Sequence, residues 1–224
     1  MEGHIKPEEV VTQPVKIPAG NVILDGDLTI PENVRGIVLF AHGSGSSRHS
    51  PRNRYVAKVL NQSNLATLLF DLLTADEEAA DAYTAHLRFD IPLLAGRLAF
   101  ATEWTRANPQ TADLKPGYFG ASTGAAAALV AAAERPQAVN AIVSRGGRPD
   151  LAGEMLEQVK APTLLIVGGN DTQVIIMNEE ALAHLHVEKK MEIVPGATHL
   201  FEEKGALEGV ARLAARWFST HLYN

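Results

Sequence analysis

The chain has 224 residues, of which 46% are hydrophobic and 21% are charged. This apolar fraction excludes an intrinsically disordered chain, and 18 glycines and 12 prolines are too few for a collagen-like or low-complexity sequence. The formal net charge of -6 gives no basic footprint for nucleic acid, and the absence of cysteine excludes disulfides, thiolate metal sites and a cysteine nucleophile.

The N-terminus and the apolar runs indicate neither export nor membrane insertion. Residues 1–11 are polar and acidic and lack the apolar segment of a secretory signal. No run approaches the roughly 18 apolar residues that a membrane-spanning helix needs. We therefore expect a cytoplasmic protein without a membrane partner, in which residues 1–14 form an N-terminal tail and residues 15–224 a single domain.

Strand-type and helix-type runs alternate along the chain. Residues 21–30 contain a glycine break and are typical of an antiparallel strand. Continuous apolar runs then predict buried strands of a parallel sheet at 36–41, 65–70, 115–119, 141–144, 163–167 and 190–194. Helices are expected between them at 53–61, 89–108, 125–134, 151–158, 178–185 and 205–222. This order predicts one doubly wound α/β domain with right-handed crossovers.

An acidic stretch at residues 71–88 is the least regular part of the chain. It follows the end of a predicted strand, and ligand sites in open α/β sheets lie outside the carboxyl ends of the strands. Two interpretations stay open. The stretch is either a solvated loop with a helical turn or a roof over a substrate pocket.

The sharpest motif is G-x-S-x-G, formed by Gly120, Ser122 and Gly124. It stands between a predicted strand and an alanine-rich predicted helix. In that context the serine lies on a strained turn and presents its hydroxyl as a nucleophile, while the glycines let the backbone fold sharply. The sequence therefore predicts a serine nucleophile at position 122.

A serine hydroxyl needs a base, and the best candidate among the eight histidines is His199. It directly follows the last predicted strand, at the edge of the sheet where Ser122 should also lie. The others are less suitable, either because they lie near the termini, on different faces of one helical run, or before Ser122 in the chain: His4, His221, His184, His186, His42, His49 and His86.

The third group should be a carboxylate that orients the imidazole. Asp171 follows the predicted strand at 163–167, although an aspartate at the start of a helix often serves only as an N-cap. Asp71 also ends a strand and is the competing candidate. The order serine, acid, histidine along the chain favours Asp171.

Backbone N–H groups should stabilise the oxyanion that forms during acyl transfer. One expected donor is Thr123, directly after the nucleophile, and the other is Ser44 in the glycine-rich turn His42-Gly43-Ser44-Gly45. We expect His42 to brace this turn without taking part in the chemistry. No phosphate-binding glycine motif is present, and no cofactor or metal is expected.

Together, HGSGSSR, GYFGASTGAAAAL, VGGNDTQV and IVPGATHLFEE resemble the α/β-hydrolase fold, and in particular small dienelactone-hydrolase-related enzymes. The chain is also similar to the hydrolase region found fused to phosphoribosyltransferase domains. The resemblance implies a mostly parallel sheet with helices on both faces and no large lid. It also implies a triad of Ser122, Asp171 and His199, with Ser44 and Thr123 as oxyanion donors. Dienelactone hydrolases proper carry a cysteine where this chain has Ser122.

Arginines near the expected oxyanion turn and after a central strand suggest an anionic substrate. Arg48 or Arg145 would hold its carboxylate or phosphate, because the guanidinium fork suits such groups. The alternative is that these arginines form ordinary ion pairs with the acidic residues 76–81. No long insertion follows the strand before Arg145, so the pocket should be open and suited to short acyl chains.

The sequence thus predicts a serine carboxylester hydrolase that acts on short-chain or anionic small-molecule esters through an acyl-enzyme. Two alternatives remain. In the first, the chain is a binding or regulatory module that keeps the fold but has negligible turnover. An acyltransferase would use the same residues and differ only in excluding water.

Overall fold

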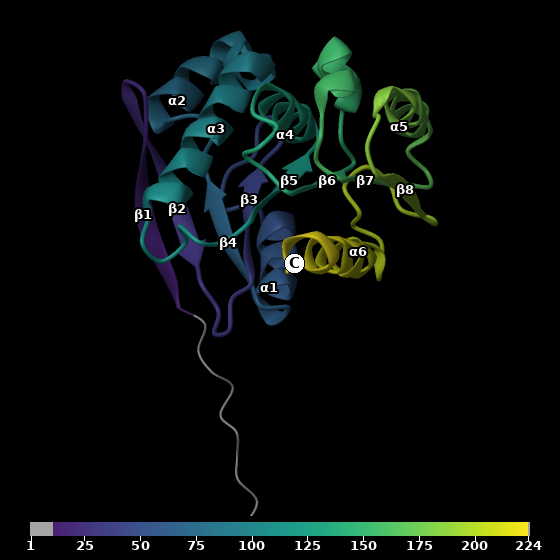
Figure 1. Ribbon diagram of the computed structural model, residues 1–224. Helices are drawn as coiled ribbons and strands as arrows, with labels where there is room; N and C mark the ends of the chain where they lie inside the picture. The colour runs from purple at the N-terminus through teal and green to yellow at the C-terminus, as the bar shows by residue number, and fades with distance from the viewer. Residues whose placement is uncertain (1–10, 224) are drawn as a thin grey trace, which may run out of the picture.

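The apolar runs expected to be strands form one sheet in the computed structural model, which describes residues 11–223 (Figure 1). The sheet has eight strands in the order β1-β2-β4-β3-β5-β6-β7-β8. The bounds are β1 (Thr12–Ala19), β2 (Val22–Thr29), β3 (Gly36–Ala41), β4 (Leu65–Phe70), β5 (Pro116–Ala121), β6 (Ala141–Arg145), β7 (Thr163–Gly168) and β8 (Lys189–Val194). β2 is antiparallel to β1 and β4, and all other pairs are parallel. The fold is therefore the expected mostly parallel α/β sheet.

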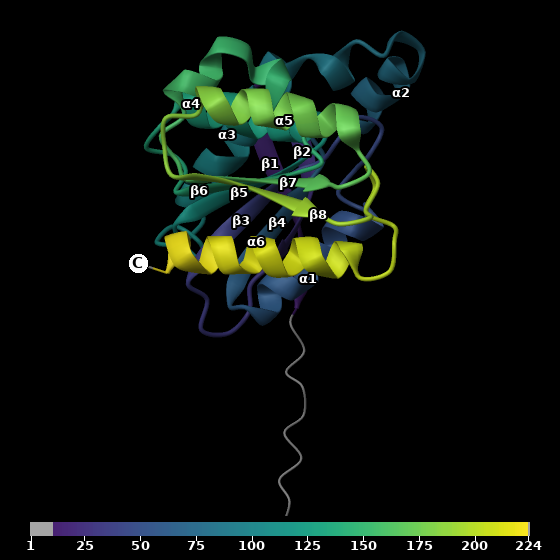
Figure 2. The same ribbon diagram turned by 90° about the vertical axis from the view of Figure 1, so that its right-hand side faces the viewer.

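Helices cover both faces of this sheet (Figures 1 and 2). They are α1 (Pro51–Gln62), α2 (Ala75–Thr84), α3 (Ile91–Ala107), α4 (Thr123–Glu134), α5 (Thr172–His184) and α6 (Ala206–Leu222), with 3₁₀ segments η1 (Leu87–Phe89) and η2 (Pro149–Gln158). α1 and α6 pack on one face, whereas α3, α4, α5 and η2 lie on the other. Each face has its own apolar core, as the continuous apolar strands predict.

Strand β1 was not expected from the sequence. Its exposure alternates along the strand, and it lies at the edge of the sheet, where Pro14 and Pro18 do not interrupt a central ladder. It begins at Thr12, within the 1–14 stretch expected to be a tail. Residues 1–10 of that stretch lie outside the described residues.

The acidic stretch after β4 is mostly helical rather than a loop. α2 starts with a capping box, in which the Thr74 hydroxyl accepts from the Glu77 N–H at 3.2 Å and the Glu77 carboxylate accepts from the Thr74 N–H at 2.8 Å. Within the last turn of α2, the buried Asp81 accepts from the Leu87 N–H and from Arg88 Nε, each at 2.6 Å. These bonds hold the acidic residues in an ordered element beside the sheet.

Helix α5 also differs from expectation, because it begins at Thr172 rather than at 178. Its first turns contain β-branched residues, which have low intrinsic helix propensity, so the sequence did not mark them as helical. His184 is its last residue, and His186 lies beyond it.

No helix within residues 11–223 is long and apolar enough to span a membrane.

Two helical glycines give a matched test of packing. A Cβ on Gly124 would lie 2.1 Å from the Ala41 carbonyl oxygen, whereas a Cβ on Gly96 would meet nothing within 4 Å. We expect Gly124→Ala to lower the free energy of unfolding by about 3 kcal/mol, because the backbone contact cannot yield. Gly96→Ala should raise it by up to about 1 kcal/mol. Urea unfolding of both variants checks this, and equal effects would contradict it.

Candidate active site

Ser122 occupies a strained turn between β5 and α4. Its φ is 51° and its ψ is -123°, a conformation that a non-glycine residue adopts only when the surroundings enforce it. Those surroundings are tight, since a Cβ on Gly120 would lie 2.4 Å from the Ala125 Cα. The serine side chain is partly exposed, while Thr123 after it is buried. The turn therefore presents one hydroxyl at the carboxyl end of the central strand.

Asp171 and His199 are joined by a hydrogen bond of 2.7 Å between Oδ2 and Nδ1. Because an ionised carboxylate only accepts, Nδ1 carries the proton and Nε2 of the neutral ring is left free. Asp171 stands at the N-cap position of α5, but its side chain makes no capping bond. Of the two carboxylates considered from the sequence, Asp171 is the one that contacts this histidine.

The turn that carries Asp171 is fastened to the loop that carries His199. The Asn170 N–H donates to the Ala197 carbonyl at 2.9 Å, and its side-chain amide donates to the Gly196 carbonyl at the same distance. A Cβ on Gly168 would lie 2.4 Å from the Ala197 oxygen, so the two segments approach closely. Main-chain contacts therefore support the carboxylate–imidazole pair.

The turn after β6 contacts both the serine and the histidine. The Ser122 N–H donates to the Arg145 carbonyl at 3.3 Å, and the Arg148 N–H donates to the Ser122 carbonyl at 3.1 Å. A Cβ on Gly146 would be 3.6 Å from His199 Cε1. Within residues 11–223, the Ser122 hydroxyl has no hydrogen bond to His199 or to any other residue. Such bonds often form only when substrate is bound.

The loop after β3 lies directly against the serine. A Cβ on Gly43 would be 3.0 Å from the Ser122 Cβ. The Ser44 N–H, expected from the sequence to point at an oxyanion, donates to the Thr123 hydroxyl at 2.9 Å. The sequence did not indicate this side-chain contact, because the residue after the serine in G-x-S-x-G is unspecified.

His42 braces the same loop, as expected. Its Nε2 accepts from the Leu72 N–H at 3.0 Å, and its Nδ1 lies 3.0 Å from the Gly43 carbonyl oxygen. Since a main-chain N–H can only donate, Nε2 must be unprotonated, and Nδ1–H donates to Gly43. Burial lowers the pKa of His42 below 6.5, which keeps the ring neutral.

Asp71, the competing acid, also fixes this loop. Its carboxylate accepts from the Arg48 N–H at 2.7 Å and pairs with the Arg48 guanidinium. Arg48 Nε lies 3.6 Å from Asp27 as well. Arg48 is thus held by two carboxylates, neither of which belongs to the acidic residues 76–81 considered as alternative partners.

Arg145, unlike Arg48, is not held by a carboxylate among the described residues. It ends β6, is 8% exposed, and has no carboxylate partner among residues 11–223. Its guanidinium lies 5.8 Å from the Phe201 ring centroid. Burial, together with the nearby positive charge of Arg52, lowers the pKa of Arg145 to about 10. A buried guanidinium beside a second cation favours the approach of an anion.

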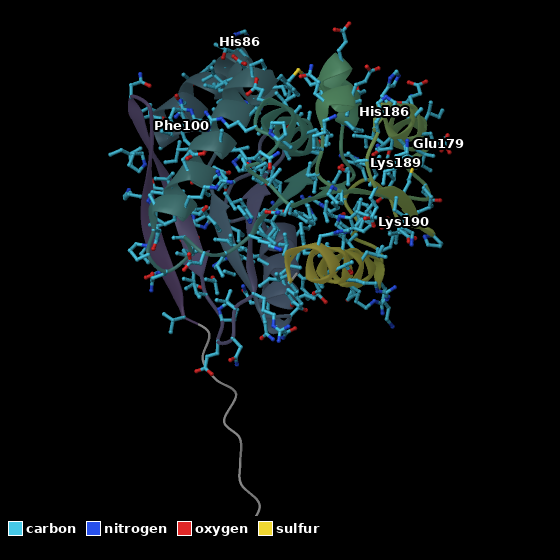
Figure 3. All side chains as sticks on the ribbon, viewed as in Figure 1. His86, Phe100, Glu179, His186, Lys189 and Lys190 are labelled. Atoms are coloured by element: carbon cyan, nitrogen blue, oxygen red, sulfur yellow. The ribbon has the colours of Figure 1, made fainter. Side chains whose placement is uncertain are left out.

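None of the other histidines within residues 11–223 contacts Asp171. His86 and His186 are exposed on the surface, away from one another (Figure 3). His184 and His221 approach Glu157 and Glu188 at 3.4 and 3.5 Å. Within the described part of the chain, no three His, Asp or Glu side chains gather closely enough to hold a metal ion.

Comparison with known proteins identifies the family of this chain. Residues 26–221 match the model of the dienelactone hydrolase family. The chain belongs to this family. A crystal structure of a dienelactone hydrolase from Anabaena variabilis is 62% identical, covers 96% of this chain and 100% of its own, and superposes with a TM-score of 0.94. The α/β-hydrolase fold expected from the sequence is confirmed.

Two further comparisons relate the chain to longer and to more distant proteins. Proteins of two Mycobacterium tuberculosis strains, each provisionally named a phosphoribosyl transferase, are 60% identical over 208 residues, which is 93% of this chain and 46% of theirs. The chain thus spans about half the length of these curated relatives, in agreement with the expected similarity to one region of a longer protein. A dienelactone hydrolase-like promiscuous phosphotriesterase from metagenomic libraries shares the fold at 17% identity, covers 95% of this chain and 99% of its own, and has a TM-score of 0.79.

The Thr123 contact can be tested by amide exchange. Thr123→Val keeps the side-chain shape but removes the hydroxyl that accepts from the Ser44 N–H. We expect the Ser44 amide hydrogen to exchange about fivefold faster in this variant, because a hydrogen bond worth about 1 kcal/mol is lost. Thr123→Ser retains the hydroxyl and should retain protection. NMR hydrogen exchange measures both, and equal protection in the two variants would show that the bond does not hold the loop.

Proposed function

We propose that this chain is a serine carboxylester hydrolase with Ser122, His199 and Asp171 as its triad. Ser122 Oγ attacks the ester carbonyl while its proton passes to His199 Nε2. The leaving alcohol takes up that proton and an acyl-enzyme forms. Water then attacks the acyl carbon, gives a proton to His199, and the released acid leaves Ser122 with its hydroxyl restored. Asp171 stabilises the imidazolium in both halves of the reaction.

The observation that carries this proposal is the Asp171–His199 bond of 2.7 Å beside a serine at φ 51°, in a chain of a hydrolase family. The bond leaves Nε2 free to act as a base, and the strained turn exposes one hydroxyl. The turn after β6 supports the proposal further, because it contacts both the Ser122 main chain and the His199 ring. Nucleophilic acyl transfer is the chemistry that uses all three.

Two main-chain donors would stabilise the oxyanion. One is the Thr123 N–H, at the positive end of α4. The other is the Ser44 N–H, which donates to the Thr123 hydroxyl when no substrate is bound. The substrate oxygen would replace that hydroxyl as acceptor when it enters. Each such donor typically contributes about 3 kcal/mol to transition-state stabilisation.

We propose short, negatively charged esters as substrates. The segment between β6 and β7 contains only η2, with no long insertion to form a lid over an acyl chain. Arg145 is the buried cation without a carboxylate partner near the His199 loop, so it would hold the negative group of the ester. Arg48 is occupied by Asp71 and Asp27 and is no longer a candidate for this role.

One observation favours the alternative of a non-catalytic binding module, namely that the Ser122 hydroxyl is not bonded to His199. A serine that is never activated would remain inert toward electrophiles. Labelling of Ser122 therefore separates the two functions.

Ser122 should react with a fluorophosphonate probe, and the wild type should hydrolyse p-nitrophenyl acetate and butyrate. Ser122→Ala should abolish labelling and lower kcat/KM by about 10,000-fold or more, because the nucleophile is lost. Ser219→Ala on α6 is the matched control and should change neither. Mass spectrometry of the labelled peptide and ester kinetics measure these effects. An unlabelled wild type would favour the binding module, and better turnover of esters beyond about eight acyl carbons would contradict an open, lidless site.

The charge preference is tested by comparing a succinate monoester with a neutral butyrate ester of the same alcohol. Arg145→Gln should reduce the ratio of kcat/KM for the charged over the neutral ester by about tenfold, because a charged hydrogen bond is lost. Arg148→Gln removes a cation already paired with Asp150 at 2.7 Å and should leave the ratio unchanged. A constant ratio in the Arg145 variant would exclude this role.

A further inference from the structure

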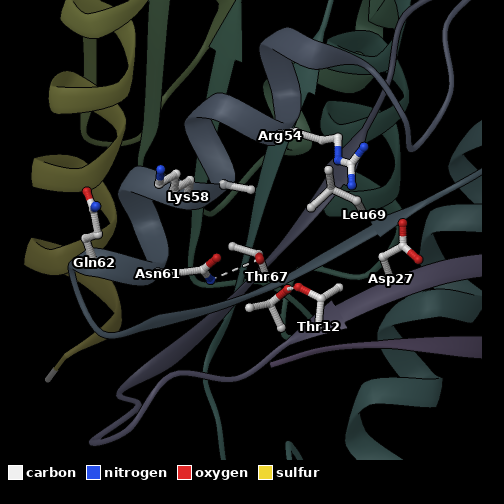
Figure 4. A pocket seen from close by; sticks show the side chains of 10 residues that line it. Thr12, Asp27, Arg54, Lys58, Asn61, Gln62, Thr67 and Leu69 are labelled. Atoms are coloured by element: carbon white, nitrogen blue, oxygen red, sulfur yellow. Dashed lines mark hydrogen bonds between the residues drawn. The ribbon is translucent and has the colours of Figure 1, made fainter. Parts of the chain in front are cut away.

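A cavity of about 540 Å³ lies between α1 and the antiparallel end of the sheet (Figure 4). Its lining comes from α1, β1, β2 and β4: Thr12, Asp27, Thr29, Arg54, Ala57, Lys58, Asn61, Gln62, Thr67 and Leu69. It arises because α1 packs on β4 and leaves the neighbouring strands uncovered on that face. None of the proposed triad or oxyanion residues lines it, so it is separate from the candidate active site.

The α1 wall of this cavity is cationic. α1 contains no acidic residue, and Arg54 and Lys58 stand four residues apart, which places them on the same side of the helix. Neither has an ion pair with any residue in the described part of the chain. The acid in the lining, Asp27, has Arg48 Nε at 3.6 Å.

The opposite wall, formed by the sheet, carries Thr12, Thr29 and Thr67 beside Leu69. The Thr12 and Thr29 hydroxyls are 2.8 Å apart, and Asn61 Nδ2 donates to the Thr67 hydroxyl at 3.1 Å (Figure 4). Asn61 also donates to the Leu65 carbonyl at 2.9 Å, so the amide is fixed with its oxygen free to accept. The cavity therefore combines two cations with fixed hydroxyl and amide groups.

We propose that this cavity binds a small organic phosphate with a hydroxyl-rich body, such as a sugar phosphate or a nucleotide. Its volume falls within the range of small-molecule sites. Arg54 offers a planar fork and Lys58 a point charge to the phosphate oxygens. The Thr12 hydroxyl and the Asn61 and Gln62 amides, which are at least partly exposed, offer donors and acceptors to the hydroxyls of a sugar. This site does not depend on the proposed esterase activity.

A second cavity supplies an internal control. It has about 560 Å³ between β8 and α6, and Arg212 and Arg216 stand four residues apart on α6 at its side. Its lining contains no serine, threonine, asparagine or glutamine. It therefore has the same helical spacing of cations but lacks the threonine, asparagine and glutamine side chains of the first cavity. General attraction of a phosphate to surface cations would use both cavities equally.

Isothermal titration calorimetry of the full chain tests the proposal with glucose 6-phosphate, AMP, glucose, inorganic phosphate and citrate. We expect glucose 6-phosphate or AMP to bind more tightly than glucose, phosphate or citrate. The double variant Arg54→Gln/Lys58→Gln should weaken that binding by at least about tenfold. The double variant Arg212→Gln/Arg216→Gln should leave it within about twofold.

Several results would overturn the proposal. Absence of saturable binding at concentrations of about 10 mM would exclude a site of useful affinity. Equal weakening by the two double variants would indicate general charge attraction. Loss of binding in Arg145→Gln alone would place the phosphate in the candidate active site, and tighter binding of citrate would exclude phosphate as the recognised group. Circular dichroism of each variant confirms that it is folded.

Discussion

The conformation of the backbone at Ser122 depends on how closely α4 approaches the ends of β3 and β5. Gly120 and Gly124 leave no room for side chains there, with a Cβ at Gly124 only 2.1 Å from the Ala41 oxygen. The chain can turn from strand to helix here only by placing Ser122, which lies between the two glycines, at positive φ. The same approach brings Thr123 to the loop after β3, and it brings the turn after β6 to the Ser122 main chain. The geometry of the site is therefore a result of packing in the sheet.

Much of this arrangement could be predicted because its signals are local. Continuous apolar runs marked the central strands, and β3 and β4 have the expected bounds. The G-x-S-x-G pattern marked the turn, since glycine is needed where two backbones meet. The pairing of Asp171 with His199 followed from both residues coming directly after parallel strands, whose carboxyl ends lie at one edge.

The parts that sequence could not supply depend on contacts between distant residues. β1 has two prolines and became visible as a strand only through its pairing with β2. The Thr123–Ser44 bond joins residues 79 positions apart, and no residue pattern marks it. Arg48 and Arg145 looked equivalent as residues near strand ends. Only the structure shows that one is held by carboxylates and that the other is buried without one.

His42 makes the stability of the loop after β3 depend on pH. The ring accepts from Leu72 through an unprotonated nitrogen, and burial holds its pKa below 6.5. The unfolded chain binds a proton more readily than the folded chain, so the stability that this ring contributes is complete above 6.5 and is lost as pH falls through the folded pKa. Once protonated, Nε2 becomes a donor facing another donor. Protonation of His42 would therefore weaken the contact between the loop after β3 and the main chain that follows β4.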